Sequence, residues 1–209
     1  GEQIKAKIIV SNLDPKRTYL KLIESSNLEG SFRKKVEGLK MEGSIAKVLL
    51  ALDGLPKWNF ANSYEDSNHF SKSHFRIAPS LEYMDKACRE ARNGRAAEEP
   101  VMWGVIPSAV NPSMAPPGKH IVCLSTFHFP YNLKGKDLRE EGKSYALRCI
   151  DVLSQYSSNI KDLVIDYKCT TPRDLEDTLG VTEGSNTHGP MMPGNIFWSR
   201  PLPGWADYR

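Results

Sequence analysis

Runs of apolar and β-branched residues predict several strands along the chain. The strongest run spans 44–52, where Ile45, Val48 and Leu50 predict a largely buried strand. Further strands are predicted over residues 5–10, 101–106, 119–128 and 163–167. The connection 111–118 contains three prolines and one glycine, and we expect these residues to prevent regular pairing between the two strands that it joins.

Capping residues and helical spacing predict helices over residues 15–23, 31–39, 81–92, 138–156 and 172–179. Asp14 can cap the first of these, and Ser80 can cap the third. The last helix opens with Thr171 to Asp174, a capping box with Asp in place of Glu, and Gly180 ends it. From the residues alone, the chain is therefore a mixed α/β protein.

Two of these helices carry apolar residues on one face, which we expect to be buried in the core. In the helix 81–92 the apolar residues recur at i, i+3, i+7 and i+10, as Leu81, Met84, Cys88 and Ala91. In the helix 138–156 the expected core face consists of Tyr145, Cys149, Val152, Leu153 and Tyr156. The polar residues of this second helix that we expect to be solvated are Arg139, Glu140, Lys143 and Arg148.

Composition and charge exclude several classes of protein. The 209 residues, with 40% apolar side chains and a net charge of +3, are typical of a globular chain. Basic and acidic residues are interleaved, which disfavours nucleic-acid binding. The longest uninterrupted apolar stretch, 48–52, is far shorter than the roughly 18 residues of a membrane span.

Cysteine and histidine spacing gives no metal motif. The four cysteines are Cys88, Cys123, Cys149 and Cys169, without a Cys-x-x-Cys pair. We expect reduced, mostly buried thiols and a reducing compartment, either the cytoplasm or one such as the mitochondrial matrix. His69 and His74 lie in the aperiodic segment 56–79, where surface histidines are the better interpretation, so no metal is expected.

Candidate chemistry is concentrated in the aperiodic segment 184–204, which is rich in glycine and proline. His188 stands between Gly184 and Gly189, where a histidine either presents its ring to a cleft for proton exchange or is a turn residue bonded to backbone. Arg200 is either a clamp for a carboxylate or phosphate, or a packed and paired arginine. No Gly-x-Gly-x-x-Gly fingerprint and no Gly-x-Ser-x-Gly elbow is present.

Four stretches resemble one known family. They are Ile-Val-Ser-Asn-Leu-Asp-Pro at 9–15 with the following Lys-Arg-Thr-Tyr-Leu, residues 46–56, residues 107–120, and 171–176 continuing through 188–189 to 200–204 and 208–209. In order and spacing they resemble the later half of FAD-dependent oxidoreductases of the phytoene-desaturase type. The subgroup that they resemble most is that of the pyridine nucleotide-disulphide oxidoreductase domain-containing 2 proteins.

This resemblance implies an α+β substrate-binding domain, with a mixed or antiparallel sheet flanked by helices and without the Rossmann domain that binds FAD. We expect residues 1–209 to form this single domain, with 1–12 and 195–209 as junctions to the missing FAD domain. The chain begins at Gly1 rather than Met, and we expect it to be a piece of a longer protein. FAD is then expected in the full-length enzyme and not in this chain alone.

The resemblance also assigns roles to particular residues. It places Ser11, Asn12 and Arg200 beside the flavin or the cleft, and His188 on the substrate side as the candidate catalytic residue. Residues 183–187 and 190–193 depart from the family's usual pattern. The expected partners are the FAD domain of the same polypeptide, an apolar small-molecule substrate and a second copy in a homo-oligomer. The alternative is a stand-alone ligand-binding or oligomerisation module without enzymatic activity.

Overall fold

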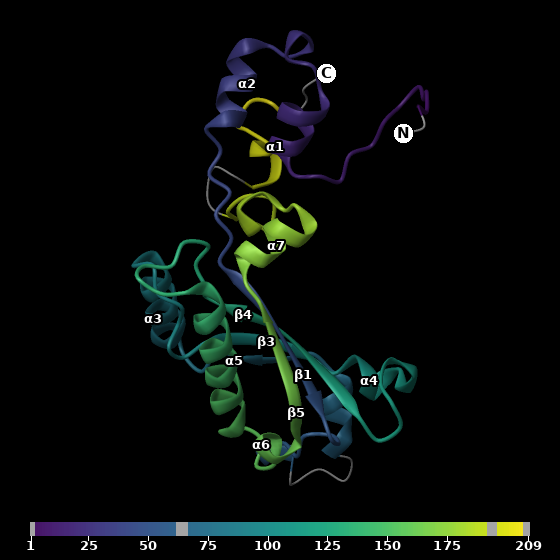
Figure 1. Ribbon diagram of the computed structural model, residues 1–209, viewed down its shortest axis with the longest axis vertical. Helices are drawn as coiled ribbons and strands as arrows, with labels where there is room; N and C mark the ends of the chain where they lie inside the picture. The colour runs from purple at the N-terminus through teal and green to yellow at the C-terminus, as the bar shows by residue number, and fades with distance from the viewer. Residues whose placement is uncertain (1–2, 62–66, 192–195, 207–209) are drawn as a thin grey trace.

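A computed structural model describes residues 3–61, 67–191 and 196–206 of the chain. The predicted junction segments 1–12 and 195–209 therefore lie partly outside the described residues, at 1–2, 195 and 207–209. The strands are β1 (Ile45–Leu52), β2 (Phe75–Ile77), β3 (Val101–Val105), β4 (His120–Phe127) and β5 (Val164–Thr170). They form one sheet in the order β2-β3-β4-β1-β5, and every pairing is antiparallel (Figure 1). With its flanking helices, this sheet confirms the predicted α+β class.

The helices fall into two groups (Figure 1). Beside the sheet lie α3 (Leu81–Arg92), α4 (Pro107–Val110), α5 (Leu138–Ser154) and α6 (Ile160–Leu163). Above it lie α1 (Pro15–Arg17), which continues as a π-helical turn over Thr18–Leu22, α2 (Gly30–Glu37) and α7 (Pro172–Leu179). Short 3-10 turns occupy Ser25–Asn27, Asn59–Ala61, Ser67–Lys72, Pro112–Met114, Thr182–Gly184 and Phe197–Ser199.

The main core lies between one face of the sheet and α5. Alternate residues of β1 are fully buried on that face, because successive side chains of a strand point to opposite sides. These residues are Ala46, Val48, Leu50 and Leu52. On α5, Tyr145, Cys149, Val152 and Leu153 are buried against the same cluster, which confirms the face predicted for this helix.

The strand predicted over residues 5–10 is wrong. Residues 3–13 form no strand, and the side chains of Ile8, Ile9 and Val10 are more than 80% exposed. An apolar β-branched run favours extended backbone, but a strand also needs a partner for its hydrogen bonds. In the described part of the chain no other strand pairs with this segment.

The expectation that 111–118 prevents pairing of the strands on either side is also wrong. β3 and β4 pair from Val101 opposite Phe127 to Val105 opposite Cys123. The prolines do not interrupt this ladder, because they lie outside both strands. The chain between β3 and β4 instead folds into α4 and the 3-10 turn Pro112–Met114.

The predicted caps are confirmed. The Asp14 carboxylate accepts a hydrogen bond from the backbone N–H of Arg17, and the Ser80 hydroxyl accepts one from Tyr83. Thr171 and Asp174 form the reciprocal capping box of α7, and Gly180 follows it with φ +69°, in the left-handed region that favours glycine. Local sequence therefore determines where these helices begin and end.

A second, smaller core brings together residues from both ends of the chain. Phe32 of α2 is fully buried, and its ring lies 4.8 Å from those of Tyr19 and Trp205, measured between centroids. Leu202 is buried in the same cluster. Between this core and the sheet, the segment that contains Gly43 lies against the segment that contains Glu183. The Gly43 N–H donates a hydrogen bond to the Glu183 carbonyl at 2.9 Å. A Cβ on Gly43 would lie 2.2 Å from the carbonyl oxygen of Gly184, so the two segments approach too closely for a side chain at Gly43.

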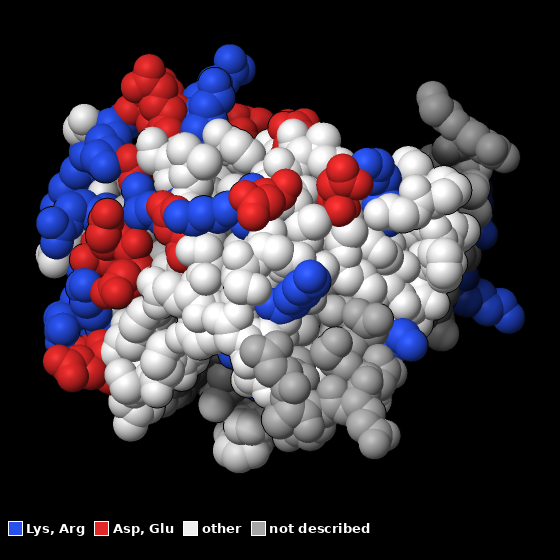
Figure 2. Space-filling view, turned by 90° about the horizontal axis from the view of Figure 1, so that it is seen from below, with Lys and Arg blue, Asp and Glu red and all other residues white. Residues whose placement is uncertain are grey.

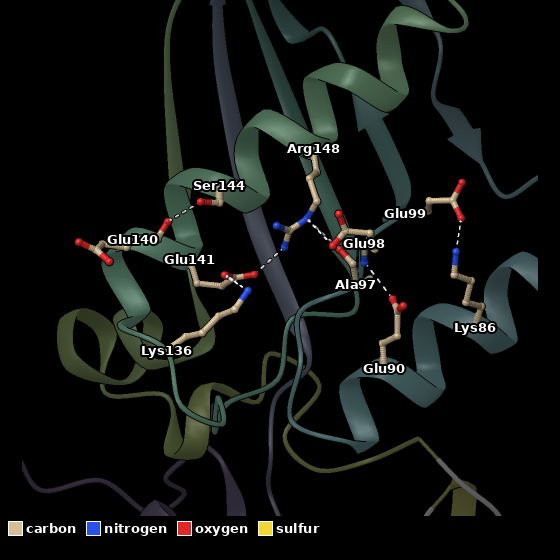
Figure 3. Close-up of polar contacts among 10 residues, drawn as sticks. All are labelled: Lys86, Glu90, Ala97, Glu98, Glu99, Lys136, Glu140, Glu141, Ser144 and Arg148. Atoms are coloured by element: carbon tan, nitrogen blue, oxygen red, sulfur yellow. Dashed lines mark hydrogen bonds and ion pairs between the residues drawn. The ribbon is translucent and has the colours of Figure 1, made fainter.

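A buried carboxylate joins α5 to the segments around it (Figure 3). Glu141 is 5% exposed, and its two oxygens accept from Lys136 Nζ at 2.6 Å and Arg148 Nη2 at 2.7 Å. Arg148 also donates from Nε to the Ala97 carbonyl at 3.2 Å. The prediction that Arg148 is solvated is therefore wrong, because its guanidinium crosses to the segment before β3. Burial alone raises the pKa of Glu141, but the hydrogen bonds from Lys136 and Arg148 outweigh it and leave the pKa below its ordinary value.

Charged side chains of both signs gather on the side of the molecule where α3 lies, and they are sparser over the rest of that view (Figure 2). Among the described residues, no helix combines the length and the apolar character that crossing a membrane requires.

The four cysteines are all free, with Cys149 buried and the other three half-buried.

Glu141→Gln should lower the free energy of unfolding by about 3 kcal/mol at neutral pH, because Arg148 then loses its buried counter-charge and keeps only the exposed Glu98 carboxylate at 3.8 Å. The lowered pKa of Glu141 means that this stability is present above the unfolded-state pKa of about 4.3 and is lost as the pH falls through the folded-state pKa. Urea denaturation at a series of pH values should show the two proteins converging in acid.

The matched control is Glu140→Gln, the exposed neighbour on the same helix. It should change the free energy of unfolding by less than about 0.5 kcal/mol. An equal loss in both variants would contradict the assignment of this stability to the Glu141 carboxylate.

Candidate functional site

The sheet has one face covered by helices and one face that remains largely open. On the open face, paired strands place Lys47 opposite Ser125 and Leu49 opposite Cys123, and Trp103 of β3 also pairs with Ser125. These residues line a hollow of about 430 Å³, the sheet hollow, which Leu175 of α7 closes at one end. Side chains alternate between the two faces of β1, so the residues between its buried positions point into this hollow.

The sheet hollow holds a polar pair within apolar walls. Lys47 Nζ donates to Ser125 Oγ at 2.6 Å. Burial raises the pKa of the neighbouring Cys123 thiol, and the Lys47 charge opposes that rise without cancelling it. Cys123 is therefore a neutral thiol at neutral pH, and Lys47 with Ser125 is the hydrogen-bonding group that a ligand here would meet.

Trp103 lies at the boundary between two hollows. Its side chain is 46% exposed, the Arg76 guanidinium lies 4.7 Å from the ring centroid, and the Phe127 ring lies at 4.9 Å. It also lines a second space of about 540 Å³, the α3 hollow, whose walls include Leu81 and Met84. A large, partly exposed indole between two apolar spaces is well placed to contact an apolar ligand.

The walls of the α3 hollow overturn the prediction that the apolar stripe of α3 is core. The side chains of Leu81 and Met84 are 85% and 43% exposed, and Cys88 is only half-buried. The residue of α3 that is buried in the main core is Ala87. The stripe is real, but it borders an open space rather than packed side chains.

A third space continues from the α3 hollow toward the smaller core. This neck hollow, of about 690 Å³, shares Cys88 and His128 with the α3 hollow and reaches Pro190 and Met191 at its other end. Each space shares lining residues with the next, so the three hollows adjoin one another, and together we call them the sheet groove. It runs from the open face of the sheet, past α3, to the segment that contains His188.

His128 occupies the junction of the α3 and neck hollows. It is half-buried directly after β4, and its Nδ1 lies 3.2 Å from Ser44 Oγ. Burial lowers its pKa, and the nearby Arg92 charge lowers it further. The ring is therefore neutral near pH 7, the state in which an imidazole can both accept and donate a hydrogen bond.

Two of the four residues proposed from the sequence lie together. Arg200 Nη2 donates to the carbonyls of Thr187 and His188, both at 2.8 Å, and Nη1 lies 3.2 Å from Met191 Sδ. His188 is half-buried on a turn with φ +54°, and its N–H donates to the Ser185 carbonyl at 3.0 Å. Arg200 thus fixes the His188 turn at the end of the sheet groove.

The other two residues lie on the exposed N-terminal segment. Ser11 Oγ lies 2.8 Å from Thr18 Oγ1 and accepts from the Leu13 N–H at 3.3 Å. Asn12 is exposed beside it. Among the four proposed residues, the structure therefore brings together His188 and Arg200, and it leaves Ser11 and Asn12 on a separate segment beside α1.

Trp103, His128 and Lys47 were missed by sequence reasoning. Each lies in or next to a predicted strand, where alternation indicates which residues share a face but not which face is open. The open face is set by pairing between strands that are distant along the chain, such as that of Lys47 with Ser125, 78 residues apart. The one available signal was a lysine inside an otherwise apolar strand, at position 47.

The described residues do not fit a metal ion or FAD by themselves. Within the described ranges, no three His, Cys, Asp or Glu side chains gather in a group suited to a metal. The pyrophosphate of FAD is held by a glycine-rich turn between a parallel strand and the N-terminus of a helix. All strand pairs in the described part of the chain are antiparallel, so it lacks the unit that carries such a turn.

Comparison with known proteins gives the same relatives as the sequence resemblance. The chain is 30% identical to a protein of Rattus norvegicus named pyridine nucleotide-disulfide oxidoreductase domain-containing protein 2, and 29% identical to the protein of the same name from Mus musculus. Both alignments cover 100% of the chain. The chain spans only 37% of the length of either relative. No family model matches the chain.

Arg92→Gln should raise the pKa of His128 toward its ordinary value of about 6.5 and leave it below that value, because burial still disfavours the charged ring. NMR titration of the His128 ring protons measures this directly. Since the folded-state pKa is lowered, the stability contributed by neutral His128 is present above about pH 6.5 and is lost as the pH falls.

The control is Arg89→Gln on the same helix, where Arg89 pairs with Asp85. It should leave the His128 titration unchanged. An unchanged His128 pKa in Arg92→Gln would show that the assigned charge interaction is absent.

Proposed function

We propose that the chain is the substrate-binding domain of an FAD-dependent oxidoreductase of the desaturase or dehydrogenase type, and that an apolar substrate lies in the sheet groove. The observation that carries this proposal is the groove itself, a row of adjoining hollows that begins on the uncovered face of an antiparallel sheet and whose first two hollows have mainly apolar walls. Similarity along the whole chain to proteins named as oxidoreductases supports the general class.

The cofactor in this proposal is bound by a part of the protein outside the chain. The relatives are much longer, since the chain spans 37% of their length. When bound, FAD supplies the hydride acceptor, and the residues of this chain orient the substrate and exclude water. The chain alone is therefore expected to be inactive.

Residues along the groove take distinct roles in this proposal. Trp103 and the exposed apolar residues of α3 contact the substrate, and the Lys47–Ser125 pair meets any polar end that it carries. His128 presents a neutral imidazole between the α3 and neck hollows. At the far end, Arg200 positions the turn of His188, which we retain as the candidate proton-handling residue.

Ser11 and Asn12 have a different place in the proposal. Both lie on the exposed segment that precedes α1, away from the strands of the sheet. From the family resemblance, we expect both residues to lie beside the flavin when the FAD-binding part of the protein is present. That role requires the exposed apolar residues of the same segment, such as Ile8 and Ile9, to be covered in the complete protein.

Trp103→Ala should weaken binding of Nile red, a neutral apolar dye, to the chain by about tenfold, because a stacked aromatic contact contributes roughly 0.5–1.5 kcal/mol beyond its buried area. Dye fluorescence titration measures the dissociation constant. The control is Trp198→Ala, which removes an 80% exposed indole outside the groove and should leave the constant unchanged. Equal effects of the two substitutions would place dye binding elsewhere and remove the support for a ligand in the sheet groove.

FAD added to the chain should show no saturable change in flavin absorbance at micromolar concentrations, because the described residues lack a parallel strand-to-helix unit for its pyrophosphate. Equilibrium dialysis against FAD provides an independent measurement. Micromolar binding would contradict the assignment of the cofactor site to another part of the protein.

A further inference from the structure

The outer edge of β5 is an open strand edge. β5 pairs with β1 on one side, and no described strand pairs with its other side, although the strand is seven residues long. Figure 1 shows β5 at the front of the sheet, running from α6 to α7. A free edge of this length exposes unpaired backbone groups and favours pairing with another strand.

One hydrogen bond identifies which backbone groups face outward. The Tyr167 N–H donates to the carboxylate of its neighbour Asp166 at 2.8 Å, so it is not used in the ladder with β1. In an antiparallel pair, alternate residues direct their N–H and C=O groups to the same side. Tyr167 and, two residues on, Cys169 therefore direct these groups to the free edge.

The side chains of β5 carry a self-complementary charge pattern. Asp166 and Lys168 are both exposed, and they lie on the open face of the sheet because their partners on β1, Ala51 and Leu49, do so. If a second copy pairs antiparallel with Tyr167 opposite Tyr167, each Asp166 lies opposite a Lys168. In this register the charged pairs are the closely spaced, non-hydrogen-bonded ones, where side chains interact most strongly.

Neighbouring registers that keep the same backbone hydrogen bonding are unfavourable. If the second strand is shifted by two residues in one direction, Asp166 lies opposite Asp166. If it is shifted by two residues in the other direction, Lys168 lies opposite Lys168. Like charges directly opposite each other destabilise a strand pair. The sequence of β5 therefore favours one two-fold register over those on either side.

The surroundings of the edge also suit a second copy. A groove of about 370 Å³ runs beside the edge, between β5 and the N-terminal parts of α5 and α7. Tyr167 contributes to its wall together with Leu138 and Gly142. Ile165, at the start of the strand, is 57% exposed and would lie opposite Cys169 of the second copy. Pairing would thus cover apolar surface as well as backbone.

We propose that β5 is a dimerisation edge, at which two copies of the chain pair antiparallel about Tyr167 and join their sheets. On pairing, the Tyr167 N–H exchanges the Asp166 carboxylate for a backbone carbonyl of the second copy. Asp166 is then free to pair with Lys168 across the interface. The proposal does not depend on the ligand in the sheet groove, because it uses the free edge and not the groove residues.

The test is a charge exchange followed by sedimentation equilibrium of the full 209-residue chain. Wild type should dimerise, and Lys168→Asp and Asp166→Lys should each weaken the dimer by about tenfold or more, because each places like charges opposite each other. The double variant Asp166→Lys with Lys168→Asp should restore the dimer. A mixture of the two single variants should form a heterodimer.

The control is Lys57→Asp, an exposed charge reversal in the loop after β1, which should leave dimerisation unchanged. Circular dichroism verifies that every variant is folded, and the restored double variant excludes a loss caused by misfolding of the singles. A wild-type chain that stays monomeric up to sub-millimolar concentration would overturn the proposal. So would a dimer that is unaffected by the single charge reversals, because the interface would then lie elsewhere.

Discussion

The one-sided burial of β1 is the constraint on which the rest of the structure depends. Four alternate residues, from Ala46 to Leu52, are fully buried against the helices, so the residues between them must face the other way. β1 also lies between β4 and β5 and pairs with both. Its register therefore determines which side chains of the neighbouring strands reach the core and which line the open face. A shift by one residue would exchange the core and the groove.

Local signals in the sequence were sufficient for several individual elements. The strand at β1, the capping box of α7 and the core face of α5 each depend on residues that are neighbours along the chain, and all are as predicted. The failures concern partners. The run around Ile8 has the composition of a strand but no strand to pair with, and the stripe around Met84 has helical spacing but borders an open space. Periodicity identifies a face and does not reveal what covers it.

The candidate site divides in the same way. His188 and Arg200 were found from a short glycine-rich and proline-rich segment, and they do meet through the His188 carbonyl. Trp103 lies in β3 and His128 directly follows β4, and each becomes significant only when the sheet places it beside α3. Because strand pairing between distant segments is set by the whole fold, a single sequence contains little direct information about it. The groove could therefore not be predicted from the sequence, although the His188 turn at one end of it could.

The small core around Phe32 has a consequence for how the chain is made. Phe32 is synthesised well before its partners Leu202 and Trp205, which lie on the far side of the sheet in the sequence. The sheet lies between them in the sequence, so it can pair all of its strands while α2 still lacks those contacts. Domains generally fold as units from the N-terminal side during synthesis, but here α2 precedes the sheet in the sequence and is completed after it. Until Trp205 emerges, the apolar face of α2 is covered only by nearby residues such as Tyr19 and Leu28.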